Sequence, residues 1–323
     1  MQRRTFAALG LALAASVPFA ASAQNGFPVK PVKFIVPYAP GGLPDSVARI
    51  VAQKLSERLG QPVVVDNKPG GNGVVAYQSL MTGPADSHSF IVSDGSMLSI
   101  TPQLNKAASY QVGKELQAVS LIARSPLFLV AHPKTGVKTL QEFVDKTKAA
   151  PGHFTYGSSG IGSTHHLTME AMKADLKLDI RHVPFRGSGQ SVPALIGGQV
   201  DFLFAALPSM AGFVKAGQVT VLASNDAKRS SQAPEVPTIA EVIPGFDFSV
   251  TIGALARTGT SPEAIKRLAD EIAWAVKQAD VVEKLQGAGI NPVGGSPEAY
   301  RKEIERENQA MAKAGKAADL KAE

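Results

Sequence analysis

The sequence predicts an α/β protein built of two lobes. Short β-type runs alternate with helical patterns early in the chain, and the same alternation restarts near residue 139. Such alternation is typical of sheets whose parallel strands are joined by right-handed crossovers. About 300 residues follow a predicted leader, which is more than one hydrophobic core usually supports, so we expect two packed units.

The first lobe is predicted from an alternating series that begins with a strand at residues 32–36. A helix follows at residues 45–59, because its apolar side chains recur at the spacing of one helix face. The series continues with a strand at 63–65, a helix at 73–81 and a strand at 90–93. Strands separated by helices predict parallel neighbours in this sheet.

The second lobe is predicted as an insertion into the first. Two adjacent β-type runs, at residues 119–123 and 127–131, precede a helix that opens at Thr139, where Glu142 has the spacing of a capping box. The elements that follow are a strand at 154–156, helices at 163–172 and 192–196, and strands at 180–183, 200–204 and 219–223.

The chain is expected to return to the first lobe through a β-type run at residues 248–256. Two helices follow, opened by Ser261-Pro262-Glu263 and Ser296-Pro297-Glu298, with proline at the first helical position, where it is tolerated. We therefore assign residues 24–124 and 249–323 to lobe 1 and residues 125–248 to lobe 2, with mixed but mostly parallel sheets.

The first 23 residues have the pattern of a signal peptide. Arg3 and Arg4 precede an apolar run at residues 6–19, and Ala21-Ser22-Ala23 supplies small residues for cleavage. The chain contains no cysteine, so neither a disulfide nor a lipid-modified cysteine is expected. These features predict an exported protein of the bacterial periplasm.

Composition argues against a nucleic-acid-binding surface. The formal net charge is +6, but the basic residues are spread along the chain, and only 6% of residues are aromatic. A nucleic-acid surface needs a basic stripe and usually stacking rings. A mild positive field suits anionic small molecules instead.

Two glycine-rich turns, each between a β-type run and a helical run, are the main candidate binding features. They are VPYAPGGLPD at residues 36–45 and YGSSGIGST at residues 156–164. A helix begins with backbone N–H groups that lack partners within the helix and with a partial positive charge, so carboxylates and phosphates bind there. The two turns lie far apart in sequence, so we expect one in each lobe, facing a shared ligand.

Several side chains near these turns have two possible roles. Asp45 suits either a ligand contact or a cap of the first helix. Ser158, Ser159 and Ser163 offer hydroxyl groups to a ligand, but serine is also an ordinary turn and cap residue. Arg186 suits either a second carboxylate of the ligand or a solvated loop position.

Three other chemistries can be compared with the residues present. His165 and His166 are adjacent on a predicted helix and point about 100° apart, without a second histidine at i+4, so no metal site is predicted. The Gly-x-Ser-x-Gly elbow of serine hydrolases is absent after Gly157. The segment from Gly71 to Ala76 matches Gly-x-Gly-x-x-Ala, which leaves an NAD-dependent enzyme as an alternative, although no cofactor and no enzymatic activity are predicted.

The order of motifs along the chain resembles the Bug/TctC family of periplasmic solute-binding proteins, which serve tripartite tricarboxylate transporters. The stretches that carry the resemblance are Val36-Pro37-Tyr38 with Pro40-Gly41-Gly42, Asp45 and Ala48-Arg49; Val65-Asp66-Asn67-Lys68-Pro69-Gly70-Gly71; Tyr156-Gly157-Ser158 with Gly160, Gly162 and His166-Leu167; Val183-Pro184-Phe185-Arg186-Gly187; Gly197-Gly198-Gln199-Val200-Asp201; and Pro234-Glu235-Val236-Pro237-Thr238-Ile239-Ala240-Glu241.

The resemblance implies a bilobed Venus-flytrap fold of type II with two crossover connections. It also implies a small organic mono- or dicarboxylate ligand, aromatic acids included, and a membrane permease or a membrane sensor as partner of a monomeric binding protein. The ligand contacts implied by the family motifs are Tyr38, Ala39, Gly41, Gly42 and Asp45 in the first lobe, and Ser158, Ser159, Gly162 and Ser163 in the second.

Overall fold

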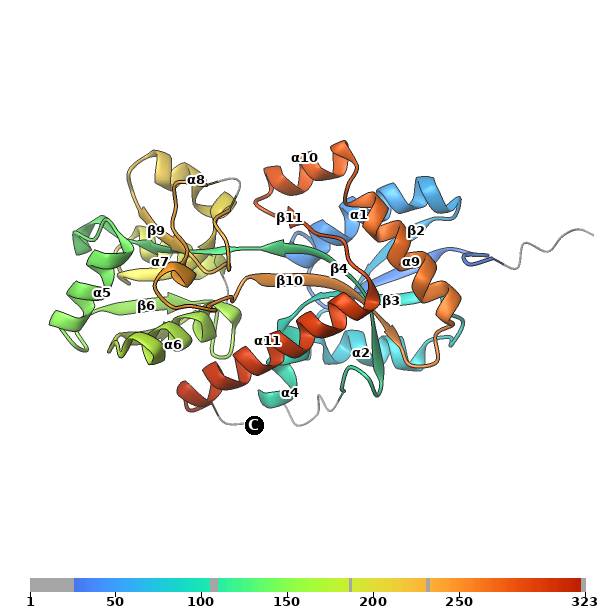
Figure 1. The fold of residues 1–323 in the computed structure, drawn as a ribbon, viewed down its shortest axis with the longest axis horizontal. Coiled ribbons are helices and arrows are strands. Elements are labelled where there is room, and N and C mark those ends of the chain that lie inside the picture. The colour runs from blue at the N-terminus through green and yellow to red at the C-terminus, as the bar shows by residue number, and fades with distance from the viewer. Residues whose placement is uncertain (1–25, 105–109, 186–187, 231–232, 321–323) are drawn as a thin grey trace, which may run out of the picture.

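Two β-sheets, each covered by helices, form the two lobes of the protein (Figure 1). The computed structural model describes residues 26–104, 110–185, 188–230 and 233–320. The predicted leader at residues 1–23 therefore lies outside the described residues, as does Arg186. None of the helices in these ranges is both long and apolar enough to cross a bilayer.

The first lobe is built on a six-stranded sheet in the order β11-β4-β10-β3-β1-β2. The side chains of Phe34 and Val36 pack on one face with helices α1 and α9, whereas Ile35 packs on the other face with α2. This alternation follows from the two-residue period of a strand. The strands are β1 (Val32–Val36), β2 (Val63–Asn67), β3 (Ser89–Asp94), β4 (Leu116–Ser125), β10 (Val250–Arg257) and β11 (Asn291–Pro292), and the helices are α1 (Leu43–Leu59), α2 (Val74–Thr82), α3 (Ser96–Ser99), α4 (Thr101–Leu104), α9 (Pro262–Ala275) and α10 (Ala279–Gly287).

The second lobe is built on a five-stranded sheet in the order β7-β6-β8-β5-β9. Phe143 and Phe202 meet edge to face beneath one face of this sheet, with ring centroids 4.7 Å apart. The strands are β5 (Leu127–Ala131), β6 (Thr155–Ser158), β7 (Arg181–Pro184), β8 (Phe202–Ala206) and β9 (Thr220–Ser224), and the helices are α5 (Leu140–Ala149), α6 (Thr164–Leu176), α7 (Ser188–Ile196) and α8 (Leu207–Lys215).

Two strand connections and one long helix join the lobes. Only Pro126 separates β4 from β5, and β10 brings the chain back, starting opposite the end of β4 where Val250 pairs with Ser125. Helix α11 (Pro297–Ala317) packs on β4 of the first lobe and on α6 of the second (Figure 1). Arg124 ties these parts together, because its guanidinium contacts Asp247 at 3.0 Å and Glu303 at 2.6 Å.

Both sheets are mixed, as expected, but the prediction that most strand pairs are parallel is wrong. Among the described strands, four pairings are parallel and five are antiparallel. The cause is the route between lobes: β10 returns between β3 and β4 and so runs against both of them. In the second lobe β5 enters between β8 and β9 and likewise runs against both.

Candidate functional site

The topology brings the two glycine-rich loops to the edges of the sheets that face the junction between lobes. The first loop follows β1, whose parallel neighbour β3 ends at Asp94, and Asp94 pairs with Ile252 near the start of β10. The second loop follows β6, whose parallel neighbour β8 ends at Ala206, and Ala206 pairs with Leu127, the first residue of β5. Both loops therefore lie at the sheet edges nearest to the strands that connect the two lobes.

The first loop ends in an uncapped helix N-terminus. Gly42 is the N-cap residue of α1 and has no side chain to satisfy the first amides of the helix. Within the described residues, the backbone N–H groups of Leu43 and Asp45 make no hydrogen bond. Gly41 has φ +87°, a left-handed conformation that favours glycine. The loop thus presents free amide donors at the positive end of a 17-residue helix.

Asp45 fastens this loop from the inside. Its carboxylate accepts hydrogen bonds from Gly41 N at 2.9 Å, Asn67 Nδ2 at 2.8 Å and Arg49 Nε at 3.0 Å. The residue is only 2% exposed. Burial opposes its ionisation, but the bonds from Arg49, Gly41 and Asn67 outweigh it and hold its pKa below the usual range. Asn67 also donates to Tyr38 O at 3.0 Å, so both ends of the loop are held.

Tyr38 and Asp94 form the second polar group at this edge. The Tyr38 hydroxyl donates to Asp94 Oδ1 at 2.7 Å, and Asp94 Oδ1 also accepts from Ser96 N at 3.1 Å and from Ser96 Oγ at 2.6 Å. Burial raises the pKa of Tyr38 well above its usual value and also raises the pKa of Asp94. The phenol therefore stays protonated and remains a hydrogen-bond donor throughout the physiological pH range.

The second loop opens α6 and has a different internal support. Ser163 is the N-cap residue: its Oγ accepts from His166 N at 3.2 Å and donates to Gly160 O at 2.7 Å. Gly160 and Gly162 have φ of +122° and +74°. Between them the side chain of Ile161 is 66% exposed, at the tip of the loop. Ser159 Oγ lies 3.0 Å from Ser188 Oγ at the start of α7.

A buried histidine, His166, and a half-buried one, His182, lie beneath this loop. Gly162 N donates to His166 Nδ1 at 3.1 Å, and His182 Nε2 lies 2.7 Å from Ser158 Oγ. The two imidazoles stack with centroids 4.1 Å apart, and the ring of Tyr156 stacks on His182 at 4.7 Å. In the sequence, His166 belongs to a stretch that resembles the Bug/TctC family and is not predicted to bind a metal, whereas no pattern singles out His182. No spacing rule could have paired His182 with Ser158, because strand pairing brings them together.

The alternative chemistries find little support in the geometry. In the described part of the chain, no group of three or more metal-ligating side chains is placed to hold an ion. Both glycines of the proposed dinucleotide motif pack against neighbouring side chains: a Cβ on Gly73 would lie 2.6 Å from Met97 Cγ, and one on Gly71 would lie 3.1 Å from Val74 Cβ. A bound pyrophosphate could not approach the backbone on the sides occupied by Met97 and Val74.

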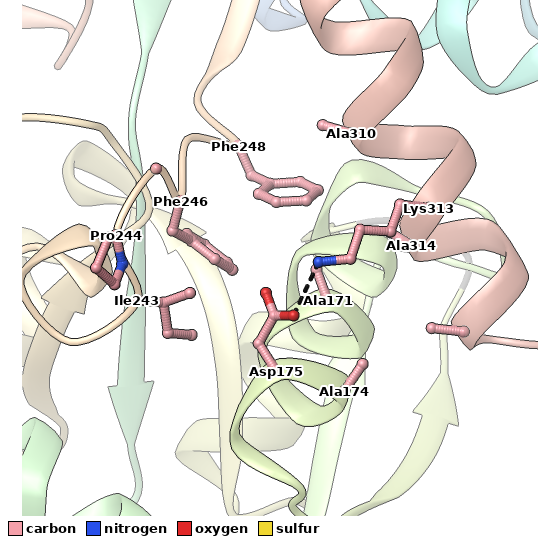
Figure 2. A pocket seen from close by; sticks show the side chains of 12 residues that line it. Ala171, Ala174, Asp175, Ile243, Pro244, Phe246, Phe248, Ala310, Lys313 and Ala314 are labelled. Carbon is pink, nitrogen blue, oxygen red and sulfur yellow. Dashed lines mark hydrogen bonds and ion pairs between the residues drawn. The ribbon is translucent and has the colours of Figure 1, made fainter.

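A separate cavity of about 160 Å³ lies between α6, residues 243–248 and α11 (Figure 2). Its walls are mainly alanines of the two helices and the rings of Phe246 and Phe248. Lys313 of α11 and Asp175 of α6 pair across it at 2.9 Å. Neither glycine-rich loop lines this cavity, so it marks the contact between α11 and the second lobe rather than the predicted site.

Two α/β lobes with helix-opening loops turned towards their junction define a bilobed binding protein of the periplasmic type. Residues 47–317 match the family described as "Tripartite tricarboxylate transporter family receptor". Protein BugT of Bordetella pertussis is 32% identical over 311 residues, which cover 96% of this chain and 95% of that protein. The chain belongs to this TctC family of solute-binding receptors.

Solved structures of similar proteins agree with this assignment. A structure titled "R. palustris Rpa4515 with adipate" is 30% identical, covers 92% of this chain and all of the other, and has a TM-score of 0.79. MatC from Rhodopseudomonas palustris with bound malate is 27% identical, covers 89% of this chain and 99% of the other, and has a TM-score of 0.73. Both are similar to this chain along nearly its whole described length.

Proposed function

We propose that this protein captures a small organic carboxylate between its two glycine-rich loops, in the periplasm, and delivers it as a monomer to the permease of a tripartite transporter. The observation that carries the proposal is the pair of helix N-termini, α1 and α6, that open towards the same junction. The proposed contacts are Tyr38, Ala39, Gly41 and Gly42 of the first loop and Ser158, Ser159, Gly162 and Ser163 of the second.

The structure suggests different roles within this set. Gly41 N–H is already bonded to Asp45, so we propose that Asp45 holds the loop in place. The backbone amides left free for a ligand are then those of Leu43 and the rest of the first turn of α1. In the sequence, Arg186 is the second residue after Pro184, the last residue of β7. We propose that it binds a second carboxylate when the ligand has one.

The ligand class is supported by two similar proteins. Adipate and malate, the molecules named in their structures, each carry two carboxylates on an aliphatic backbone. A dicarboxylate could bind one helix N-terminus with each end, or one loop and Arg186. We therefore propose short aliphatic dicarboxylates ahead of aromatic monocarboxylates. Because contacts to both lobes favour the closed form, binding would shift the protein towards closure.

The proposal is tested by titration calorimetry of the exported chain with adipate, malate, benzoate and citrate, and with NAD as a control. We expect micromolar binding of a dicarboxylate and none of NAD. Gly42→Val tests the loop, because Gly42 has φ −72° and a Cβ there meets nothing closer than 3.5 Å. The variant should therefore fold, yet its side chain crowds the free amides, and affinity should fall at least about tenfold, or 1.4 kcal/mol.

The matched control is Gly287→Val at the end of α10, where a Cβ also has open space and no loop is nearby. Its affinity should equal that of the wild-type protein. Binding of NAD alone would overturn the proposal, and undiminished carboxylate affinity in a folded Gly42→Val protein would remove the first loop from the site.

A further inference from the structure

We propose that His166 and His182 are positioning residues: a stacked pair of neutral imidazoles, one buried and one half-buried, that sets the shape of the second loop and so makes carboxylate binding sensitive to acid. The inference rests on the proposed function, because it assigns the second loop to the ligand. Neither histidine is among the proposed ligand contacts, and both lie beneath the loop rather than at its tip.

His166 fixes the backbone of the loop at Gly162. Its Nδ1 accepts the Gly162 N–H at 3.1 Å, which requires Nδ1 to be unprotonated and leaves the proton of the neutral ring on Nε2. The residue is 5% exposed. This bond engages the Gly162 amide within the protein, whereas the amides of Thr164 and His165, in the first turn of α6, make no hydrogen bond within the described residues. His166 also donates its own N–H to Ser163 Oγ, so one residue holds two points of the loop.

His182 holds the start of the same loop from β7. Its Nε2 lies 2.7 Å from Ser158 Oγ, and Ser158 Oγ accepts the Gly160 N–H at 3.1 Å. A chain of hydrogen bonds thus runs from the imidazole through a fully buried hydroxyl to the loop backbone. Each histidine therefore supports a different glycine of the loop, and the 4.1 Å stack keeps the two rings in register.

The groups packed around the pair disfavour a positive charge there. Tyr156 of β6 covers His182 and contributes only a neutral ring and a hydroxyl. Glu170 of α6 faces His166 and favours its charged form, but this carboxylate is already bonded by the Tyr156 hydroxyl and by Lys173 Nζ at 2.6 Å. Lys173, also on α6, opposes protonation of both histidines, and two charged rings at stacking distance would repel each other.

The consequence is a loss of loop order in acid. Burial lowers the pKa of His166 and lowers that of His182 to about 3. A histidine with a depressed folded pKa stabilises the fold fully above its unfolded pKa of about 6.5, and this contribution is lost as the pH falls towards the folded pKa. Protonation of Nδ1 would also remove the acceptor for Gly162. The free energy that keeps the loop ordered should therefore decrease progressively below about pH 6.5, and binding should weaken once the loop opens.

Conservative variants separate positioning from simple packing. In His166→Asn the side-chain oxygen takes the place of Nδ1 and can still accept from Gly162, whereas His166→Leu keeps bulk and loses the acceptor. We expect His166→Leu to bind adipate about tenfold more weakly or worse, and His166→Asn to stay within about threefold of wild type. His182→Gln and His182→Leu should behave in the same paired way. The control is His153→Leu, an exposed histidine that precedes the start of β6 whereas the loop follows the end of that strand, which should change nothing.

A readout without ligand keeps the test independent of the proposed function. Amide hydrogen exchange of Gly162, followed by NMR, should be slow in wild type and in His166→Asn and faster in His166→Leu. Wild-type exchange should accelerate from pH 6.5 to 4.5 beyond the intrinsic trend, while His166→Asn should not show this excess. Equal protection of Gly162 in all variants would overturn the inference. If no carboxylate binds to wild type, the proposed function fails, while the exchange data still decide the role of His166.

Discussion

At the scale of single residues, the conformation of the first loop depends on the hydrogen bonds that the Asp45 carboxylate accepts. Three donors converge on one carboxylate, from Gly41, Arg49 and Asn67. The amide in Asp45→Asn offers one acceptor oxygen and adds two donors, so at least one buried donor loses its partner. We predict that Asp45→Asn lowers the free energy of unfolding by about 1–3 kcal/mol and weakens carboxylate binding, measured by urea denaturation and calorimetry.

The control for this prediction is Asp270→Asn on α9. Asp270 pairs with Lys266 at the same i,i+4 spacing as Asp45 and Arg49, but both side chains are exposed. Exposed pairs of this kind contribute about 0.5 kcal/mol or less. Equal effects of the two substitutions would show that Asp45 contributes only a surface ion pair and does not hold the loop.

At the scale of elements, α11 carries a buried acid into the junction. Glu307 is 5% exposed, accepts from Thr251 Oγ1 at 2.6 Å and lies against the backbone of Gly95. Burial, aided by the nearby charges of Asp94 and Glu303, raises its pKa to about 8. A carboxyl with a raised folded pKa stabilises the fold fully below its unfolded pKa, and this contribution is lost as the pH rises through the folded pKa.

We predict that Glu307→Gln removes this pH dependence while keeping the bond from Thr251. The stability of the variant relative to wild type should rise by on the order of 1 kcal/mol per pH unit between pH 5 and 8. Urea denaturation at each pH measures the difference. Glu305→Gln, which changes an exposed acid on the same helix, is the control. Parallel profiles for wild type and Glu307→Gln would refute a buried neutral Glu307.

Elements with local start signals were predictable from the sequence. Ser261 and Ser296 cap α9 and α11 as expected, each accepting a backbone N–H of the first turn at 3.1 and 3.2 Å. Thr139 caps α5, but Glu142 bonds the N–H of Lys138 rather than completing the box at Thr139. Helix α8 was missed, because its only start signal is a proline at the first turn after a buried strand.

The candidate site was predictable only in part. The two glycine-rich loops are local in sequence, so their position before α1 and α6 could be read directly. Their supports are not local: Asn67 comes from β2 and His182 from β7, and each reaches its loop through strand pairing. The positions of such supporting side chains in the sequence show no regular spacing from the loop, because only the pairing of strands in the folded protein brings them next to it.

At the scale of the whole molecule, capture of a ligand between the two loops would require the lobes to move relative to each other. The two strand connections can bend, but α11 also bridges the lobes through Lys313 and the alanine-lined cavity against α6 (Figure 2). Small side chains and an unfilled volume of about 160 Å³ allow the helices to shift without clashes. We therefore expect the contact of α11 with α6 to permit the proposed closure of the lobes.

The most direct test of the proposed site is amide hydrogen–deuterium exchange of residues 24–323 with and without adipate. We predict that the ligand protects residues 38–45 and residues 158–166 together, because the first turns of α1 and α6 would bind the same molecule. Residues around Gly287 should be unaffected. Protection of one loop alone, or protection confined to the cavity between α6 and α11, would contradict a ligand held between the two loops.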